Sequence, residues 1–79
     1  MQNIQNNANN ANIAYWLSFV INRYAKSKNL TSDVVFPKLR EYGVLDFLLN
    51  HYETEHLEKI IYVIEDMDNI LLRNGGDLG

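Results

Sequence analysis

Residues 57–72 read LEKIIYVIEDMDNILL and carry the clearest helical signal in the chain. At about 100° per residue, apolar side chains spaced by three or four positions fall on one broad face of an α-helix. That face consists of Leu57, Ile60, Ile61, Ile64, Met67, Leu71 and Leu72. Val63 and Ile70 widen it on one flank, so the helix should contact more than one neighbour. We therefore predict that this helix is the central packing element.

The polar side chains of this helix predict two different roles. Tyr62, Glu65, Asp66 and Asn69 occupy most of the remaining surface and form a candidate partner-binding face. Asp68 instead projects into the apolar arc. A buried carboxylate must be hydrogen-bonded or paired, and a Tyr hydroxyl or the free amides of a helix N-terminus could serve. We expect a structural clamp at Asp68, with a ligand site as the alternative.

Composition limits the class of protein. The 79 residues suffice for one domain near the lower size limit of a single hydrophobic core, so a partner or a second copy would be unsurprising. The chain has no cysteine, which excludes disulfides and thiolate chemistry. Its longest apolar run, residues 60–64, is too short to span a bilayer, and we expect a cytoplasmic protein. Seven Lys and Arg against ten Asp and Glu argue against nucleic-acid binding.

The N-terminal third predicts a leader and a helix. Residues 1–11 are rich in Asn and Gln, too polar to offset the entropy of ordering, so we predict a disordered leader. A helix should follow, from residue 12 to about 28, because its apolar side chains recur at helical spacing. Tyr15 and Phe19 lie beside that stripe, as a second packing surface, including a dimer interface, or as an exposed anchor.

Three local signals divide the rest of the chain. Thr31 is a candidate N-cap for a second helix that ends near residue 42, and Pro37 should bend it or delay its start. Gly43 fits the positive-φ position after that helix. A short apolar third helix follows, and Thr54 can cap the long final helix after a link over residues 51–54.

These elements predict an all-α fold, a small bundle of four helices with the third one short. Residues 12–74 should form the single helical domain, and residues 75–79 should be a frayed tail.

No constellation typical of an enzyme or a cofactor site is visible, so we expect no catalytic, cofactor or metal residues. His51 and His56 are five positions apart and cannot chelate one metal from a continuous helix; an intervening turn could bring them together with Glu53 or Glu55. The expected role of both histidines is at the surface or in capping. A DNA-binding helix-turn-helix would place its recognition helix at residues 32–42. This segment contains a proline and only two cations, which argues against that motif.

Two segments resemble a family of short bacterial proteins known as a domain of unknown function. They are YGVLDFL at residues 42–48 and YVIEDMD at residues 62–68, within a similarity that covers about residues 15–72. Where that family often has His-Thr-Gln, this chain has His56 followed by Leu-Glu. Genes of the family often lie near one for an ADP-ribosyltransferase-like protein that resembles a toxin. The resemblance thus implies an accessory or antitoxin-like binding role.

The expected function is a non-enzymatic protein–protein interaction module, with an ADP-ribosyltransferase-like protein as the partner that the resemblance implies. The alternative is a self-associating structural protein, a homodimer formed through Tyr15 and Phe19.

Overall fold

The computed structural model describes the backbone of residues 2–78 and the side chains of residues 10–78. This part of the chain is all-helical and contains no strand. The helices are α1 (Gln2–Ser27), α2 (Ser32–Glu41), α3 (Val44–Asn50), α4 (Tyr52–Glu55) and α5 (Ile60–Arg73). The fold class is therefore as predicted, but five helices replace the expected four.

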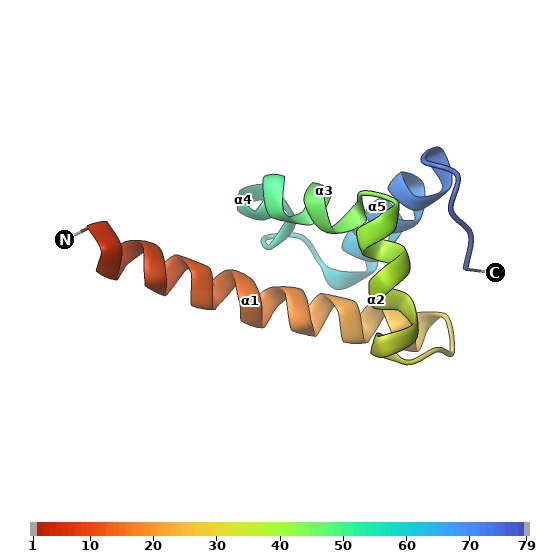
Figure 1. Cartoon of the computed structure of the whole chain (residues 1–79), viewed down its shortest axis with the longest axis horizontal. Helices are drawn as coiled ribbons and strands as arrows, with labels where there is room; N and C mark the ends of the chain where they lie inside the picture. Colours follow the sequence, from red (N-terminus) through yellow and green to blue (C-terminus); the bar gives the residue numbers. More distant parts are fainter. Residues whose placement is uncertain (1, 79) are drawn as a thin grey trace.

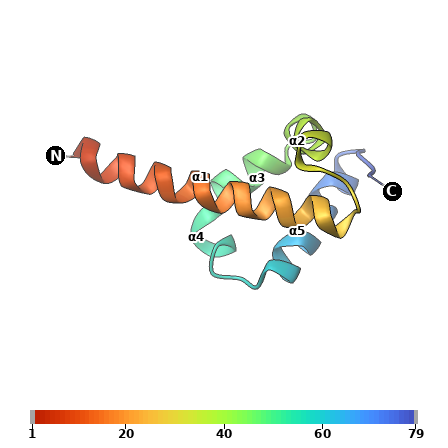
Figure 2. The ribbon, with the colours of Figure 1, turned by 90° about the horizontal axis from the view of Figure 1, so that it is seen from below.

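The helices pack as a ring with one appendage. α1 contacts α2 and α5, and α3 contacts the same two helices from the other side; α4 packs on α3. Figure 1 shows α1 along the long axis, with its N-terminal part extending beyond the other helices. In the perpendicular view, α2 and α5 lie on opposite sides of α1 (Figure 2). The shape is accordingly elongated, with extents of 45 × 23 × 22 Å.

The core lies inside this ring and draws on every helix except α4. Each of the other four helices contributes two to four apolar side chains at helical spacing. Together they form one hydrophobic core from which water is excluded. The buried set comprises Val20, Ile21, Tyr24, Ala25, Val35, Leu39, Val44, Leu48, Val63, Met67 and Leu71. Val63 and Met67 at its centre make α5 a packing element for both α1 and α3.

The predicted disordered leader over residues 1–11 is not confirmed. α1 is already helical from Gln2 and continues without a break into the packed part of the helix. Extending an existing helix fixes one residue per added hydrogen bond, so a polar segment can continue a helix that a packed segment has nucleated. Residue 1 and the side chains of residues 2–9 lie outside the described part of the chain.

The turns around α2 follow the predicted signals in position. Asn29 adopts φ 58° after α1, and Gly43 adopts φ 77° between α2 and α3. Thr31 is the N-cap residue of α2, but its side chain makes no capping hydrogen bond. Pro37 lies inside α2, which begins at Ser32, so the delayed start predicted for this helix is not observed.

The predicted start of the last helix was wrong. The link was predicted over residues 51–54, but Tyr52–Glu55 form α4, and α5 begins only at Ile60 after the N-cap residue Lys59. Thr54 therefore does not cap α5; its hydroxyl donates to the carbonyl oxygen of His51 at 3.2 Å, within α4. Glu55 does not lie in the first turn of α5. It is the last residue of α4, and its side chain is buried in the protein.

The tail after α5 packs against the domain in place of fraying. Gly76 is buried and its amide donates to the carbonyl oxygen of Leu71 at 2.8 Å. A Cβ on Gly76 would lie 2.8 Å from Cδ2 of Tyr42, so the absence of a side chain allows this contact. Leu78 is half-buried against the core. The predicted frayed tail is therefore wrong for residues 75–78, and residue 79 lies outside the described part.

Candidate functional site

The predicted partner-binding residues lie on the side of α5 that faces away from the core. Tyr62, Glu65 and Asn69 are exposed, and Asp66 is half-buried at the edge of this group. At about 100° per residue, the exposed side chains of Ile61 and Leu72 point in nearly the same direction as Glu65. We call the surface formed by Ile61, Tyr62, Glu65, Asn69 and Leu72 the α5 outer face.

Three exposed apolar residues, two of them on this face, contradict the predicted buried stripe. Leu57, Ile61 and Leu72 were assigned to the buried stripe, but their exposed fractions are 77%, 58% and 61%. The buried direction of α5 is instead centred on Val63 and Met67. The α5 sequence is apolar on more than one side, and periodicity alone cannot say which side meets a neighbour. The residues left outside form an apolar surface in contact with water.

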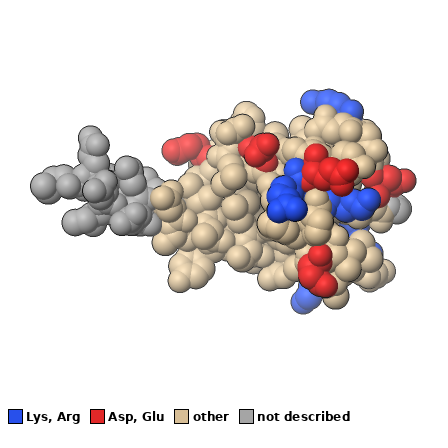
Figure 3. Space-filling model, viewed as in Figure 1, with Lys and Arg blue, Asp and Glu red and all other residues tan. Residues whose placement is uncertain are grey.

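Charge on α5 is distributed asymmetrically. Glu65, Asp66 and Asp68 are its acidic residues, whereas its basic residue, Arg73, is at the C-terminal end. Figure 3 shows one face of the molecule, on which the charged side chains over α3 and α4 are acidic, while Lys and Arg side chains lie among acidic ones at the other end. A partner that approaches the α5 outer face therefore meets apolar side chains beside carboxylates.

Asp68 joins α5 to α1 through two hydrogen bonds. The hydroxyl of Tyr24 donates to Oδ1 at 2.7 Å, and the ammonium group of Lys28 donates to Oδ2 at 2.9 Å. Burial, together with the Asp68 hydrogen bond and charge, raises the pKa of the Tyr24 hydroxyl. The Asp68 side chain remains 31% exposed, so it sits at the rim of the core and not within it. This geometry is that of an interhelical clamp, with a Tyr hydroxyl as one partner.

A second pair of polar residues holds the ends of α2 and α5 together. Nδ2 of Asn74 donates to the carbonyl oxygen of Tyr42 at 2.6 Å. Gly43 follows in the left-handed region, where a Cβ would also lie 3.4 Å from that amide nitrogen. Gly43, which the sequence predicted as a turn residue, thus lies beside the hydrogen bond between Asn74 and Tyr42. That contact was not predicted from the sequence.

The two histidines lie beside aromatic rings. The ring of His51 is 4.8 Å from that of Phe47, and His56 stacks on Tyr52 at 4.3 Å. Nδ1 of His56 is 2.6 Å from the Tyr52 carbonyl oxygen, which fixes the ring. Tyr52 in turn meets Trp16 of α1 edge-on at 5.3 Å. Among the described residues, no group of three or more His, Cys, Asp or Glu is placed to hold a metal ion.

The carboxyl pair of Glu55 and Asp66 was missed by the sequence analysis. Glu55 is only 8% exposed, and its Oε1 has no hydrogen-bond partner within the described part of the chain. Burial, then the hydrogen bond with Asp66 and the charges of Asp66 and Glu58, raise the pKa of Glu55 to about 7. No sequence signal indicated this pair, because Glu55 was placed in the first turn of the long final helix and Asp66 on an exposed face of the same helix.

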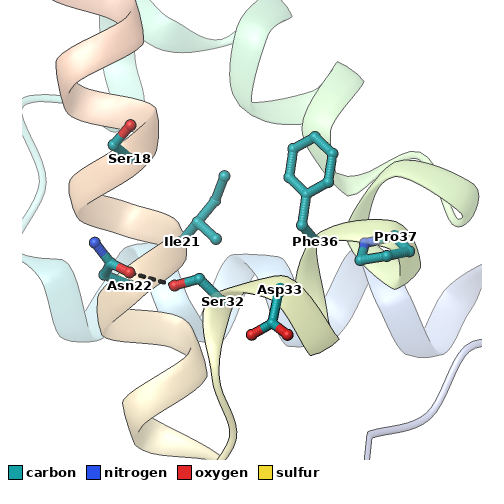
Figure 4. Close-up of a pocket in the computed structure, with 7 residues that line it drawn as sticks. All are labelled: Ser18, Ile21, Asn22, Ser32, Asp33, Phe36 and Pro37. Atoms are coloured by element: carbon teal, nitrogen blue, oxygen red, sulfur yellow. Dashed lines mark hydrogen bonds between the residues drawn. The ribbon is translucent and has the colours of Figure 1, made fainter.

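A shallow groove separates α1 from α2 on another side of the molecule. Its volume is about 490 Å³, and Ile21 and Phe36 lie on its two sides (Figure 4). The rim is polar, with Ser32 donating a hydrogen bond to Oδ1 of Asn22. Tyr15 and Phe19 lie on the same helix as Ile21 and are exposed. The predicted self-association residues are thus exposed on the helix that forms one side of this groove.

Comparison with known proteins places the chain in a family. The family model described as "Protein of unknown function (DUF3791)" matches residues 16–74, a span that includes all of α2 to α5 and the packed part of α1. The chain therefore belongs to this family. No curated protein and no solved structure matches it. Within the described residues, none of the helices has both the length and the apolar character needed to cross a membrane.

Proposed function

We propose that this chain is a non-enzymatic protein–protein interaction module whose partner docks on the α5 outer face. The observation that carries this proposal is the exposure of Ile61 and Leu72 on the solvent side of α5. Single exposed apolar residues are ordinary, but several on one helix face are typical of an interface. The neighbouring carboxylate of Glu65 favours a partner that surrounds its apolar contact with basic side chains.

The resemblance to bacterial proteins names the first partner to test, an ADP-ribosyltransferase-like protein encoded nearby. An antitoxin-like or accessory role in the bacterial cytoplasm follows if binding changes the activity of that enzyme. The chain's own contribution would be the docking surface, since the proposal assigns it no catalytic group.

A matched pair of substitutions tests the surface. Ile61→Asp places a charge on the α5 outer face, and Val34→Asp makes a comparable change at an exposed apolar residue of α2. The tagged protein is used to capture partners from its native cells, and the affinity of each captured protein is then measured with purified components. We expect Ile61→Asp to weaken binding at least about tenfold, because a charge would have to be buried. Equal affinities of the two variants would contradict the proposed face.

A homodimer formed through α1 is the second candidate function. Tyr15 is 78% exposed, and Phe19, 49% exposed, lies one turn further along the same helix. An exposed aromatic pair on a helix can form a two-fold interface in which each copy supplies the same residues. Light scattering over a concentration series should then show a dimer that Tyr15→Ser shifts to monomer. A monomer at all concentrations would contradict this candidate.

A further inference from the structure

The carboxyl groups of Glu55 and Asp66 connect α4 to α5. Glu55 is the last residue of α4, its side chain is buried with Oε1 unpartnered, and Asp66 of α5 is the nearby carboxyl group that raises its pKa. Ionised carboxylates can only accept hydrogen bonds. Two neighbouring carboxyl groups can therefore form a hydrogen bond with each other only when one of them holds a proton.

The groups around Glu55 offer no compensation for a second negative charge. Asp66 faces it from α5 and Glu58 from the turn that follows α4, and both repel a carboxylate. His56, the next residue, turns Nδ1 to the Tyr52 carbonyl oxygen. In the described part of the chain, no Lys or Arg forms an ion pair with Glu55, Glu58 or Asp66. Ionised Glu55 would be a buried charge without a cation.

The element that carries Glu55 is the weakest in the fold. α4 has four residues and contributes no apolar side chain to the core. It packs on α3, and Tyr52 meets Trp16 of α1 edge-on at 5.3 Å. Short elements with few buried contacts open locally at a small free-energy cost. Moving α4 outward is thus the least costly way to bring an ionised Glu55 into water.

We propose that the Glu55–Asp66 pair is a proton-operated latch, which holds α4 against α5 while one proton is shared and releases α4 when that proton is lost. The pKa of Glu55, raised to about 7 by burial and then by Asp66 and Glu58, places release near neutral pH. Release separates the ring of Tyr52 from that of Trp16. The latch acts through the chain's own residues and does not depend on the proposed partner.

Direct titration of the full-length protein tests the latch. Carbon NMR of labelled Glu and Asp carboxyl groups should show Glu55 titrating with a midpoint near 7, in place of its ordinary value of 4.5. Linkage requires the opening constant of α4, from amide exchange corrected for its intrinsic rate, to rise by up to about 300-fold between those two values and to level off above them. The fluorescence of Trp16, the single tryptophan, should change over the same range.

Matched variants separate the latch from other titrations. Glu55→Gln cannot ionise and can still donate to Asp66, so it should abolish the pH dependence of α4 opening. Glu53→Gln makes the same change on the exposed side of α4 and should keep it. His56→Gln removes the nearby imidazole and should also keep it.

A Glu55 midpoint near 4.5, or α4 opening that remains pH-dependent in Glu55→Gln, would overturn the proposal. If Glu55→Gln does not fold, the carboxyl titration and the amide exchange of the wild-type protein still test the proposed latch.

Discussion

The clamp at Asp68 should stabilise the packing of α1 on α5 mainly through the Tyr24 hydroxyl. Tyr24→Phe removes only that hydroxyl and leaves the ring in the core, where Tyr24 is fully buried. A hydrogen bond to a charged acceptor contributes about 1.5–3 kcal/mol, and partial exposure of Asp68 favours the lower end of that range. The Lys28 pair, with side chains 25% and 31% exposed, should contribute at most about 1 kcal/mol because water screens it.

The assay is chemical denaturation of three single variants, Tyr24→Phe, Lys28→Gln and Asp68→Ala, and of the Tyr24→Phe, Asp68→Ala double variant. We expect the free energy of unfolding to fall by about 1–2 kcal/mol in Tyr24→Phe and by about 1–3 kcal/mol in Asp68→Ala. In Lys28→Gln it should fall by less than about 1 kcal/mol. A loss of 1 kcal/mol corresponds to a melting temperature lower by about 4–8 °C for a domain of this size. The double variant should lose less than the sum, because the two changes remove one shared bond.

The pH dependence of stability gives an independent check on the same bond. Tyr24 has a folded-state pKa above its ordinary value of 10.0, so the folded protein holds the phenolic proton more tightly than the unfolded chain. Its contribution is fully present below pH 10.0 and is lost as pH rises further. Tyr24→Phe should remove this loss. If Lys28→Gln destabilised the protein more than Tyr24→Phe, or if the double variant were additive, the assignment of the clamp to the hydroxyl would be refuted.

Further predictions concern the tail, the core and the acid pair. Gly76→Ala places a Cβ 2.7 Å from Cδ1 of Leu71 and 2.8 Å from Cδ2 of Tyr42, so thermal unfolding should show a loss of about 1–3 kcal/mol; an unchanged melting temperature would mean that the tail is not docked. Met67→Ala truncates a fully buried side chain of α5 and should cost about 2–5 kcal/mol by denaturant titration, whereas a loss below 1 kcal/mol would contradict its central position. For Glu55, whose folded pKa is raised, the stabilising contribution is present below pH 4.5 and is lost as pH rises to about 7. Denaturation across this range should show that decline in the wild-type protein and not in Glu55→Gln.

The sequence by itself determined the helical class and several of the local boundaries. Apolar spacing in α1 and α5 predicts helices because only a helical backbone brings such positions to one side. Gly43 was predicted from the same kind of local physics, since few residues adopt positive φ at low cost in free energy. A Tyr hydroxyl near Asp68 was also foreseeable, because a carboxylate at the core rim requires a donor.

Tertiary structure decided which side of α5 is buried, where that helix begins and what Glu55 meets. Ile61 and Met67 are both apolar residues of one helix, and only the positions of α1 and α3 leave the first exposed and the second buried. Glu55 is a charged residue in a polar segment, and nothing local indicates that α4 turns it toward Asp66. Propensity and periodicity act over a few residues, whereas burial, charge pairing and exposed surface depend on contacts between segments far apart in the chain.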